Sequence, residues 1–288
     1  MLKEWPLVAF TILGQMAVGL FLLTGFFLLV IWSTPSAAGR RTLLFDLALV
    51  LGLLITAALV SFFHLRHPLR AHRVLANLRT SWLSREIFFE LGFMGLVAVA
   101  GLQTWRGAER SVPFAGVLVA ACVAGALFLV SMSKLYMLPT LPAWNIAYTP
   151  LSFGLTALIL GALSLAISLR FGGGSWDTSR LLLRLSSMAL VVEIPLAIFI
   201  APRHGICVIR PRPSLRPVDE LPRLLHWGRV ALLGAGLVFV EVEFFTGIDG
   251  MTTRRGPGPA LILAFMLILL GEIAGRFHFY GLVARPGR

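Results

Sequence analysis

Eight apolar stretches, each about 20 residues or longer, run through this sequence and are separated by polar segments. The hydrocarbon core of a bilayer is about 30 Å thick, so a helix that spans it needs roughly 20 apolar residues. The predicted helices cover about residues 6–32, 42–63, 86–105, 112–135, 149–169, 181–201, 227–248 and 258–282. The sequence therefore predicts an all-α integral membrane protein, built as a bundle of eight transmembrane helices.

The composition agrees with this fold class. Of the 288 residues, 58% are hydrophobic and only 13% are charged, with a mean hydropathy of +0.88; an ordinary soluble domain is about 25% charged. Most connectors are short and contain turn residues, so residues 1–288 are predicted to form a single transmembrane domain. The two cysteines, Cys122 and Cys207, lack metal-ligand spacing, which argues against a disulfide framework or an iron–sulfur cluster in this chain.

An even number of helices places both termini on one side of the membrane, together with the connectors that follow the second, fourth and sixth helices. We call this side face A. Face A carries most of the 25 Lys and Arg residues and all six histidines. The opposite face carries Arg40, Arg41, Arg106, Arg110, Arg170, Arg180, Arg184, Arg254 and Arg255. By the positive-inside rule face A is predicted to be cytoplasmic, including the connector from His64 to Arg85; basic loops of this kind also bind anionic lipids.

The connector "HLRHPLRAHRVLANLRTSWLSREI" concentrates polar chemistry on face A. His64 ends one predicted helix and Glu86 opens the next, so both are expected at the hydrocarbon boundary. A histidine and a carboxylate are a suitable pair of proton acceptors for the oxidation of a quinol, or of donors for the reduction of a quinone. Arg70 and Arg73 are candidates for a hydrogen bond to a quinone carbonyl or for a pair with Glu86. A histidine that caps its helix at the membrane interface is the structural alternative for His64.

A second stretch on face A, "KLYMLPTLPAWNIAYTP", is rich in aromatic residues. Such residues commonly anchor a helix at the membrane interface. Tyr136, Trp144 and Tyr148 are also candidates for an aromatic wall around a ring-shaped ligand, and we include Tyr136 and Trp144 in the predicted quinone site.

Several further carboxylates fall inside apolar stretches. In "GEIAGRFHFYG", Glu272 and Arg276 are one helical turn apart and are expected to pair with each other. Glu90, Glu193, Glu241 and Glu243 allow a proton path, although spacing alone does not connect them. These buried carboxylates motivate an ion or solute transporter as the alternative function; a b-type cytochrome with His64 and His278 as haem ligands is a third possibility.

These three stretches, with the opening "EWPLVAFTILGQMAVGLF", resemble the membrane anchor subunit of the dimethyl sulfoxide reductase family over all eight helices. The resemblance implies the quinone-binding subunit of a three-subunit complex in a bacterial inner membrane. Its partners would be a ferredoxin-like four-cluster iron–sulfur subunit and a molybdopterin catalytic subunit, and no nucleic acid. It also implies that His64, Arg70 and Glu86 serve a site for menaquinone or ubiquinone, with no haem or metal in this chain.

The basic connectors on face A differ from those of the best-known reductase anchors, whose quinol site faces the periplasm. Some relatives of the family serve cytoplasmic catalytic subunits, notably the complexes that oxidise sulfite and deliver electrons to quinone. The predicted topology therefore favours a sulfite-oxidising complex slightly over one that reduces a sulfoxide or N-oxide. The sequence leaves open the substrate, the direction of electron flow, the quinone type and the oligomeric state.

Overall fold

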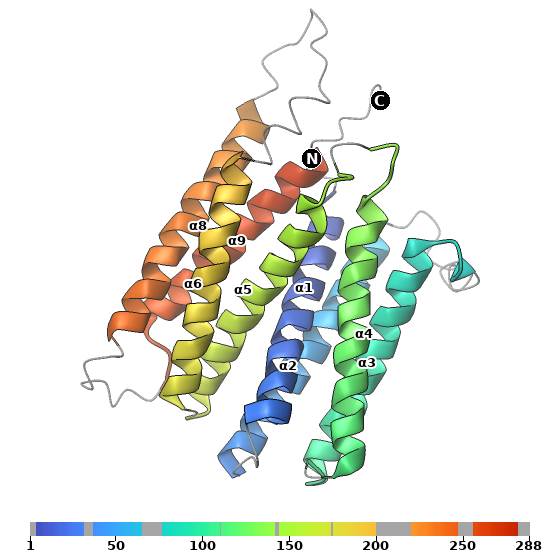
Figure 1. Cartoon of the computed structure of the whole chain (residues 1–288), viewed down its shortest axis with the longest axis vertical. Coiled ribbons are helices and arrows are strands. Elements are labelled where there is room, and N and C mark those ends of the chain that lie inside the picture. The colour runs from blue at the N-terminus through green and yellow to red at the C-terminus, as the bar shows by residue number, and fades with distance from the viewer. Residues whose placement is uncertain are drawn as a thin grey trace, which may run out of the picture.

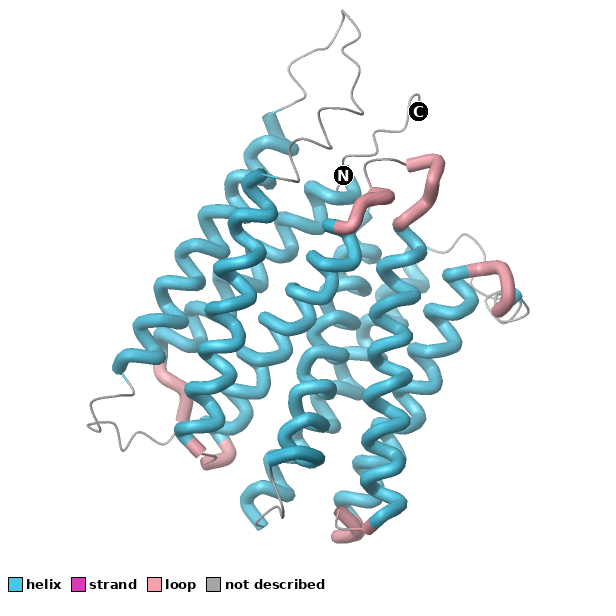
Figure 2. The backbone as a smooth tube through the Cα atoms, in the orientation of Figure 1, coloured by secondary structure: helices cyan, strands magenta, loops and turns pink. Residues whose placement is uncertain are grey.

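The computed structural model describes residues 4–31, 37–64, 77–109, 111–141, 144–173, 175–199, 220–246 and 256–281. Within these ranges every regular element is a helix, and short loops join several of the helices (Figure 2). The elements are α1 (Trp5–Phe26), η2 (Phe27–Ile31), α2 (Ala37–Ser61), η3 (Phe62–His64), α3 (Trp82–Trp105), α4 (Val112–Tyr136), α5 (Tyr148–Phe171), α6 (Trp176–Phe199), α8 (Glu220–Thr246) and α9 (Pro259–Gly281).

Consecutive long helices run in opposite directions, so the start of α1 and the end of α9 lie at the same end of the bundle (Figure 1). This end corresponds to face A. All eight predicted helices are present in the described residues. Seven of them are long and apolar enough to cross a membrane. The eighth, α8, does not meet the same criterion, and it carries the charged residues Arg229, Glu241 and Glu243 while packing along α6 and α9.

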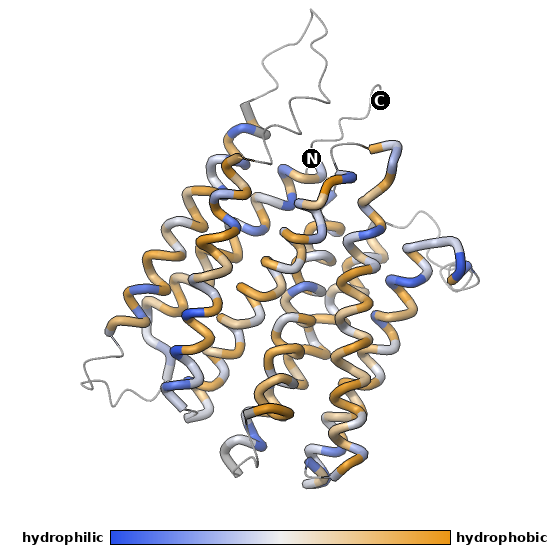
Figure 3. The backbone as a smooth tube through the Cα atoms, viewed as in Figure 1, coloured by the Kyte–Doolittle hydropathy of each residue, from blue (hydrophilic) through white to orange (hydrophobic). Residues whose placement is uncertain are grey.

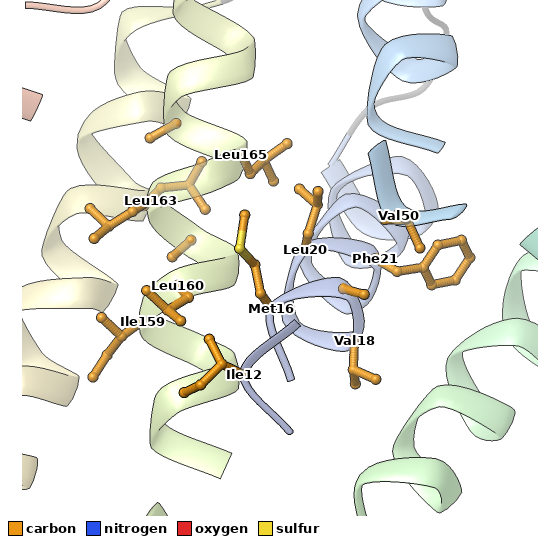
Figure 4. Packing of buried hydrophobic residues seen from close by; sticks show 14 of the residues in the cluster. Ile12, Met16, Val18, Leu20, Phe21, Val50, Ile159, Leu160, Leu163 and Leu165 are labelled. Atoms are coloured by element: carbon orange, nitrogen blue, oxygen red, sulfur yellow. The ribbon is translucent and has the colours of Figure 1, made fainter. Parts of the chain in front are cut away.

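Helices α1 and α5 form the centre of the bundle and cross in backbone contact. A Cβ atom added at Gly19 would lie against the carbonyl of Ala157, and one added at Gly161 would lie 2.3 Å from the carbonyl carbon of Gly19. Small residues at this crossing allow close van der Waals packing, which holds helices together where lipid removes the hydrophobic driving force. Larger side chains such as Met16 and Leu160 pack on either side of the contact (Figure 4).

Apolar side chains cover the outside of the bundle as well as its interior. Phe45, Leu59, Met188 and Val238 are exposed large hydrophobic residues, while the hydrophilic residues gather mainly toward the two ends (Figure 3). An exterior of this kind is suited to lipid rather than water. The structure therefore agrees with the integral membrane protein predicted from composition.

Two helices begin earlier than the apolar pattern predicts. Helix α3 begins at Trp82 because Ser81 caps it, accepting a hydrogen bond from the backbone N–H of Ser84. The prediction that Glu86 opens this helix is therefore wrong, since Glu86 lies one turn inside it. Helix α8 begins at Glu220, seven residues before the predicted start, because its first turns are polar.

Candidate functional site

The first turns of α3 bury two carboxylates near face A. Glu86 is 2% exposed and Glu90, one turn further along the same face of the helix, is 5% exposed. The Oε1 atom of each has no hydrogen-bond partner among the described residues. A buried carboxylate normally has a charged or hydrogen-bonding partner, because burying it alone is costly. Two buried carboxylates without such partners in the described chain are therefore the clearest sign of a functional site.

A compact aromatic cluster lies at the same end of the bundle. Tyr136 ends α4, Trp144 precedes α5, and Phe279 and Tyr280 belong to the last turn of α9. The ring of Trp144 stacks on that of Phe279, with centroids 5.1 Å apart, and its Nε1–H donates to the Phe279 carbonyl at 2.9 Å. The ring of Tyr136 lies edge-on to that of Trp144 at 5.5 Å. Tyr136 and Trp144, predicted to form one aromatic wall, are indeed neighbours.

Two tyrosine hydroxyls connect this cluster to Glu86. The hydroxyl of Tyr280 donates to that of Tyr136 at 2.8 Å, and both tyrosines interact electrostatically with Glu86. Glu86, Tyr136, Trp144 and Tyr280 thus form one group near face A, which we call the face A site. Tyr280 was not among the predicted residues. Its position one turn after Arg276 was the only sequence signal for it.

The remaining predicted residues cannot all be placed in this site. The backbone of His64 ends η3 at the face A end, where Phe63 contacts Trp5 of α1 at a centroid distance of 5.9 Å. The side chain of His64 and the whole of Arg70 and Arg73 lie outside the described residues. Tyr148 is turned toward α8, where its hydroxyl accepts a hydrogen bond from Arg229 at 3.0 Å.

A second polar group, deeper in the bundle, is built around Arg229 of α8. Its Nη2 atom lies 2.5 Å from Oε1 of Glu193 on α6 and 3.3 Å from Oε2 of Glu272 on α9. Ser152 of α5 contacts both Arg229 and Glu193 at 3.4 Å. All three charged side chains are almost fully buried. One arginine therefore connects α5, α6, α8 and α9, and sequence reasoning had treated it only as a basic residue of face A.

Arg276 of α9 lies between this charged group and the face A site. It donates to Gln15 of α1 at 2.8 Å and to the hydroxyl of Thr156 at 3.2 Å, and its guanidinium lies 3.8 Å from the ring centroid of Phe153. The predicted ion pair between Glu272 and Arg276 is not the one that forms. Glu272 pairs with Arg229 instead, because α8 presents a second arginine at the same depth.

The other carboxylates of the apolar stretches have arginine partners toward the opposite face. Glu243 pairs with Arg170 at 3.2 Å, and Glu241 pairs with Arg184 at 3.3 Å. Glu86 and Glu90 differ from these in making no ion pair within the described part of the chain. In that same part, no three His, Cys, Asp or Glu residues are arranged to hold a metal ion.

The long apolar helices and the internal charge pairs define a polytopic helical membrane protein with a polar site near one face. The family described as "DMSO reductase anchor subunit (DmsC)" matches residues 1–282. The anaerobic dimethyl sulfoxide reductase chain YnfH of Escherichia coli K12 is 32% identical over 97% of this chain and 94% of its own length. A second anaerobic dimethyl sulfoxide reductase chain from the same organism is 29% identical over the same shares.

This chain belongs to the family of dimethyl sulfoxide reductase anchor subunits, as its sequence motifs predicted. A further relative, a sulfite dehydrogenase subunit of Allochromatium vinosum, is 49% identical over 59 residues, which are 20% of this chain and 18% of that protein. No solved structure matches the chain. The protein is thus an integral membrane anchor subunit.

Proposed function

We propose that this anchor oxidises a quinol at the face A site and passes the electrons to an iron–sulfur subunit docked on face A. The observation that carries the proposal is the buried carboxylate of Glu86, which has no ion-pair partner in the described chain and lies near the hydroxyls of Tyr136 and Tyr280. Apolar surroundings with a few convergent polar groups are typical of sites for small ring-shaped ligands. Menaquinone and ubiquinone both fit this description.

The chemistry requires acceptors for two protons and two electrons. Loss of both electrons and both hydroxyl protons converts the quinol to the quinone. The carboxylate of Glu86 accepts one proton, and His64, at the end of η3, accepts the other. Arg70 and Arg73, from the connector that follows, are proposed to hydrogen-bond the carbonyl oxygens. Trp144 and Tyr136 supply aromatic surface against the quinone ring.

The electrons leave through partner subunits. In our proposal a ferredoxin-like four-cluster subunit docks on face A and carries them to a molybdopterin catalytic subunit. The similarity over nearly the whole length is to chains of dimethyl sulfoxide reductases, whereas the match to a sulfite dehydrogenase subunit spans 59 residues. The sequence-based preference for sulfite oxidation is thus unsupported, and we propose the reductase direction, from quinol to the catalytic partner. The proposed location is a bacterial inner membrane, with face A cytoplasmic on the basis of its positive charge.

The test compares Glu86→Gln with Glu241→Gln in the complex assembled with its partner subunits. Glu241 is the matched control because it also lies in a long helix but pairs with Arg184 near the opposite face. We expect Glu86→Gln to lower quinol-linked turnover by about 10²-fold, the range of a general base, and to change its pH profile. Activity with a soluble artificial donor should persist in both variants.

Two results would contradict this assignment. Quinol-linked turnover with an unchanged pH profile in Glu86→Gln would remove Glu86 from proton transfer. Equal loss of the quinol-linked and the artificial-donor activities would make Glu86 a structural residue of the complex.

A further inference from the structure

A hollow opens between α2 and α5 at the end of the bundle opposite face A. Its volume is about 600 Å³, and it is lined by Arg41, Thr42, Phe45, Ser168, Phe171 and Gly172. The first turns of α2 and the last turn of α5 form its two walls. It lies at the other end of both helices from the face A site, so it belongs to a different region of the protein.

Arg41 supplies a positive charge at this hollow. The adjacent Arg40 pairs with Glu109 at 2.6 Å, and Arg170, near the end of α5, pairs with Glu243 at 3.2 Å and lies over the ring of Trp176. Arg41 is exposed and makes no ion pair among the described residues. The arginine that lines the hollow therefore has a guanidinium available for an anion, while its two neighbours are engaged by carboxylates.

The rest of the lining combines apolar rings with a polar floor. Phe45 is 57% exposed and Phe171 is 71% exposed, on the surface that faces lipid. The buried hydroxyl of Ser168 makes no hydrogen bond of good geometry within the described chain, although the carboxyl of Asp46 is near it. Asp46 is not part of the lining, so its carboxyl does not face a ligand at Arg41. A cation beside exposed rings and a hydroxyl on the floor are suited to an amphipathic anion.

We propose that this hollow binds a glycerophospholipid with an anionic headgroup. Its phosphate lies against the guanidinium of Arg41, which binds phosphate oxygens in a bidentate geometry. The hydroxyl of Ser168 donates to an oxygen of the glycerol ester, and the acyl chains run along Phe45 and Phe171 toward the hydrocarbon. The location at the end of two membrane-spanning helices places the phosphate at headgroup depth.

The experiment is native mass spectrometry of the full-length chain in its complex, titrated in detergent with phosphatidylglycerol or phosphatidylcholine. The variants are Arg41→Gln, Arg41→Lys and, as matched control, Arg106→Gln, which removes an exposed arginine after α3 at the same end. We expect the unmodified chain and Arg106→Gln to bind the first phosphatidylglycerol equally. Arg41→Gln should bind it about tenfold more weakly, as the loss of a charge-assisted contact implies. Arg41→Lys should fall between them.

A second variant, Ser168→Leu, fills the floor and keeps Arg41. We expect it to weaken phosphatidylglycerol binding without altering the charge of the protein. Equal binding of phosphatidylglycerol to the unmodified chain and Arg41→Gln would overturn the proposal, as would equal affinity for phosphatidylcholine and phosphatidylglycerol in the unmodified chain. Unaltered binding in Ser168→Leu would show that the lipid lies elsewhere.

Discussion

Replacement of Arg229 by methionine tests the charged group that connects α5, α6, α8 and α9. Methionine keeps the length and flexibility of the side chain but removes its charge and its bonds to Tyr148, Ser152, Glu193 and Glu272. The side chains of both carboxylates are at most 1% exposed, so neither gains access to water when its partner is lost. Removing one partner of a buried ion pair lowers stability by about 3–5 kcal/mol.

Arg184→Met is the control for this variant. Arg184 pairs with Glu241 at 3.3 Å, but its side chain is 44% exposed and that of its partner is 30% exposed. It also lies over the ring of Phe244 at 3.5 Å. An exposed ion pair contributes about 0–1 kcal/mol and an exposed cation–π contact about 0.5–1 kcal/mol, so the control should lose about 1–2 kcal/mol.

The assay is reversible unfolding of the purified chain in mixed micelles, followed by tryptophan fluorescence as sodium dodecyl sulfate is increased. A double variant, Glu193→Gln with Arg229→Met, removes one carboxylate together with the arginine and leaves Glu272 one turn from Arg276. We expect it to recover at least half of the stability lost in Arg229→Met. Equal losses in Arg229→Met and Arg184→Met would refute the argument, and so would a double variant less stable than Arg229→Met alone.

Further outcomes follow from the same structure. Gly161→Leu should prevent accumulation of folded protein, because α1 leaves no space for its side chain, whereas Gly154→Leu on the same helix has no atom within 4 Å of its Cβ and should accumulate normally, as measured by detergent-soluble yield. Glu90→Gln should lower quinol-linked turnover less than Glu86→Gln, since Glu90 lies one turn further from face A; an equal or larger loss in steady-state assays would assign the main proton transfer to Glu90. A green fluorescent protein fused to the C-terminus should fluoresce in cells, because face A is proposed to be cytoplasmic, and a dark fusion beside an active alkaline phosphatase fusion would reverse the topology.

The number and order of the long helices followed from the sequence because the bilayer sets a minimum apolar length. Their starts were less predictable where a cap or polar turns extended the helix beyond the apolar stretch. Ser81, three residues before Ser84, is a recognisable N-cap, and with it the start of α3 is readable from the sequence. The polar first turns of α8 carry no such signal in the described residues, and there the packing against α9 decides the start.

Residue partners in the interior were harder to predict than helices. The spacing of Glu272 and Arg276 suggested a pair, since residues four apart share a helix face. The observed partner, Arg229, comes from another helix, and its position depends on how α8 and α9 pack. Glu86 and Trp144 were identified by chemistry and position alone, but Tyr280 was not, because its contact with Tyr136 joins residues 144 positions apart.

The pattern of pairing also bears on the choice between an anchor and a transporter. The transporter alternative was based on buried carboxylates, and a transported cation would need some of them unpaired along the bundle. In the described chain the carboxylates of α6, α8 and α9 are held by Arg170, Arg184 and Arg229, which neutralises them in place. The two carboxylates of α3, which make no ion pair in the described residues, lie within about a turn of each other near face A, and α3 continues toward the opposite face with buried Phe93, Val97 and Ala100. A proton acceptor that opens to one face is what quinol oxidation requires, and a route across the membrane would need polar groups where α3 buries only apolar ones before Thr104.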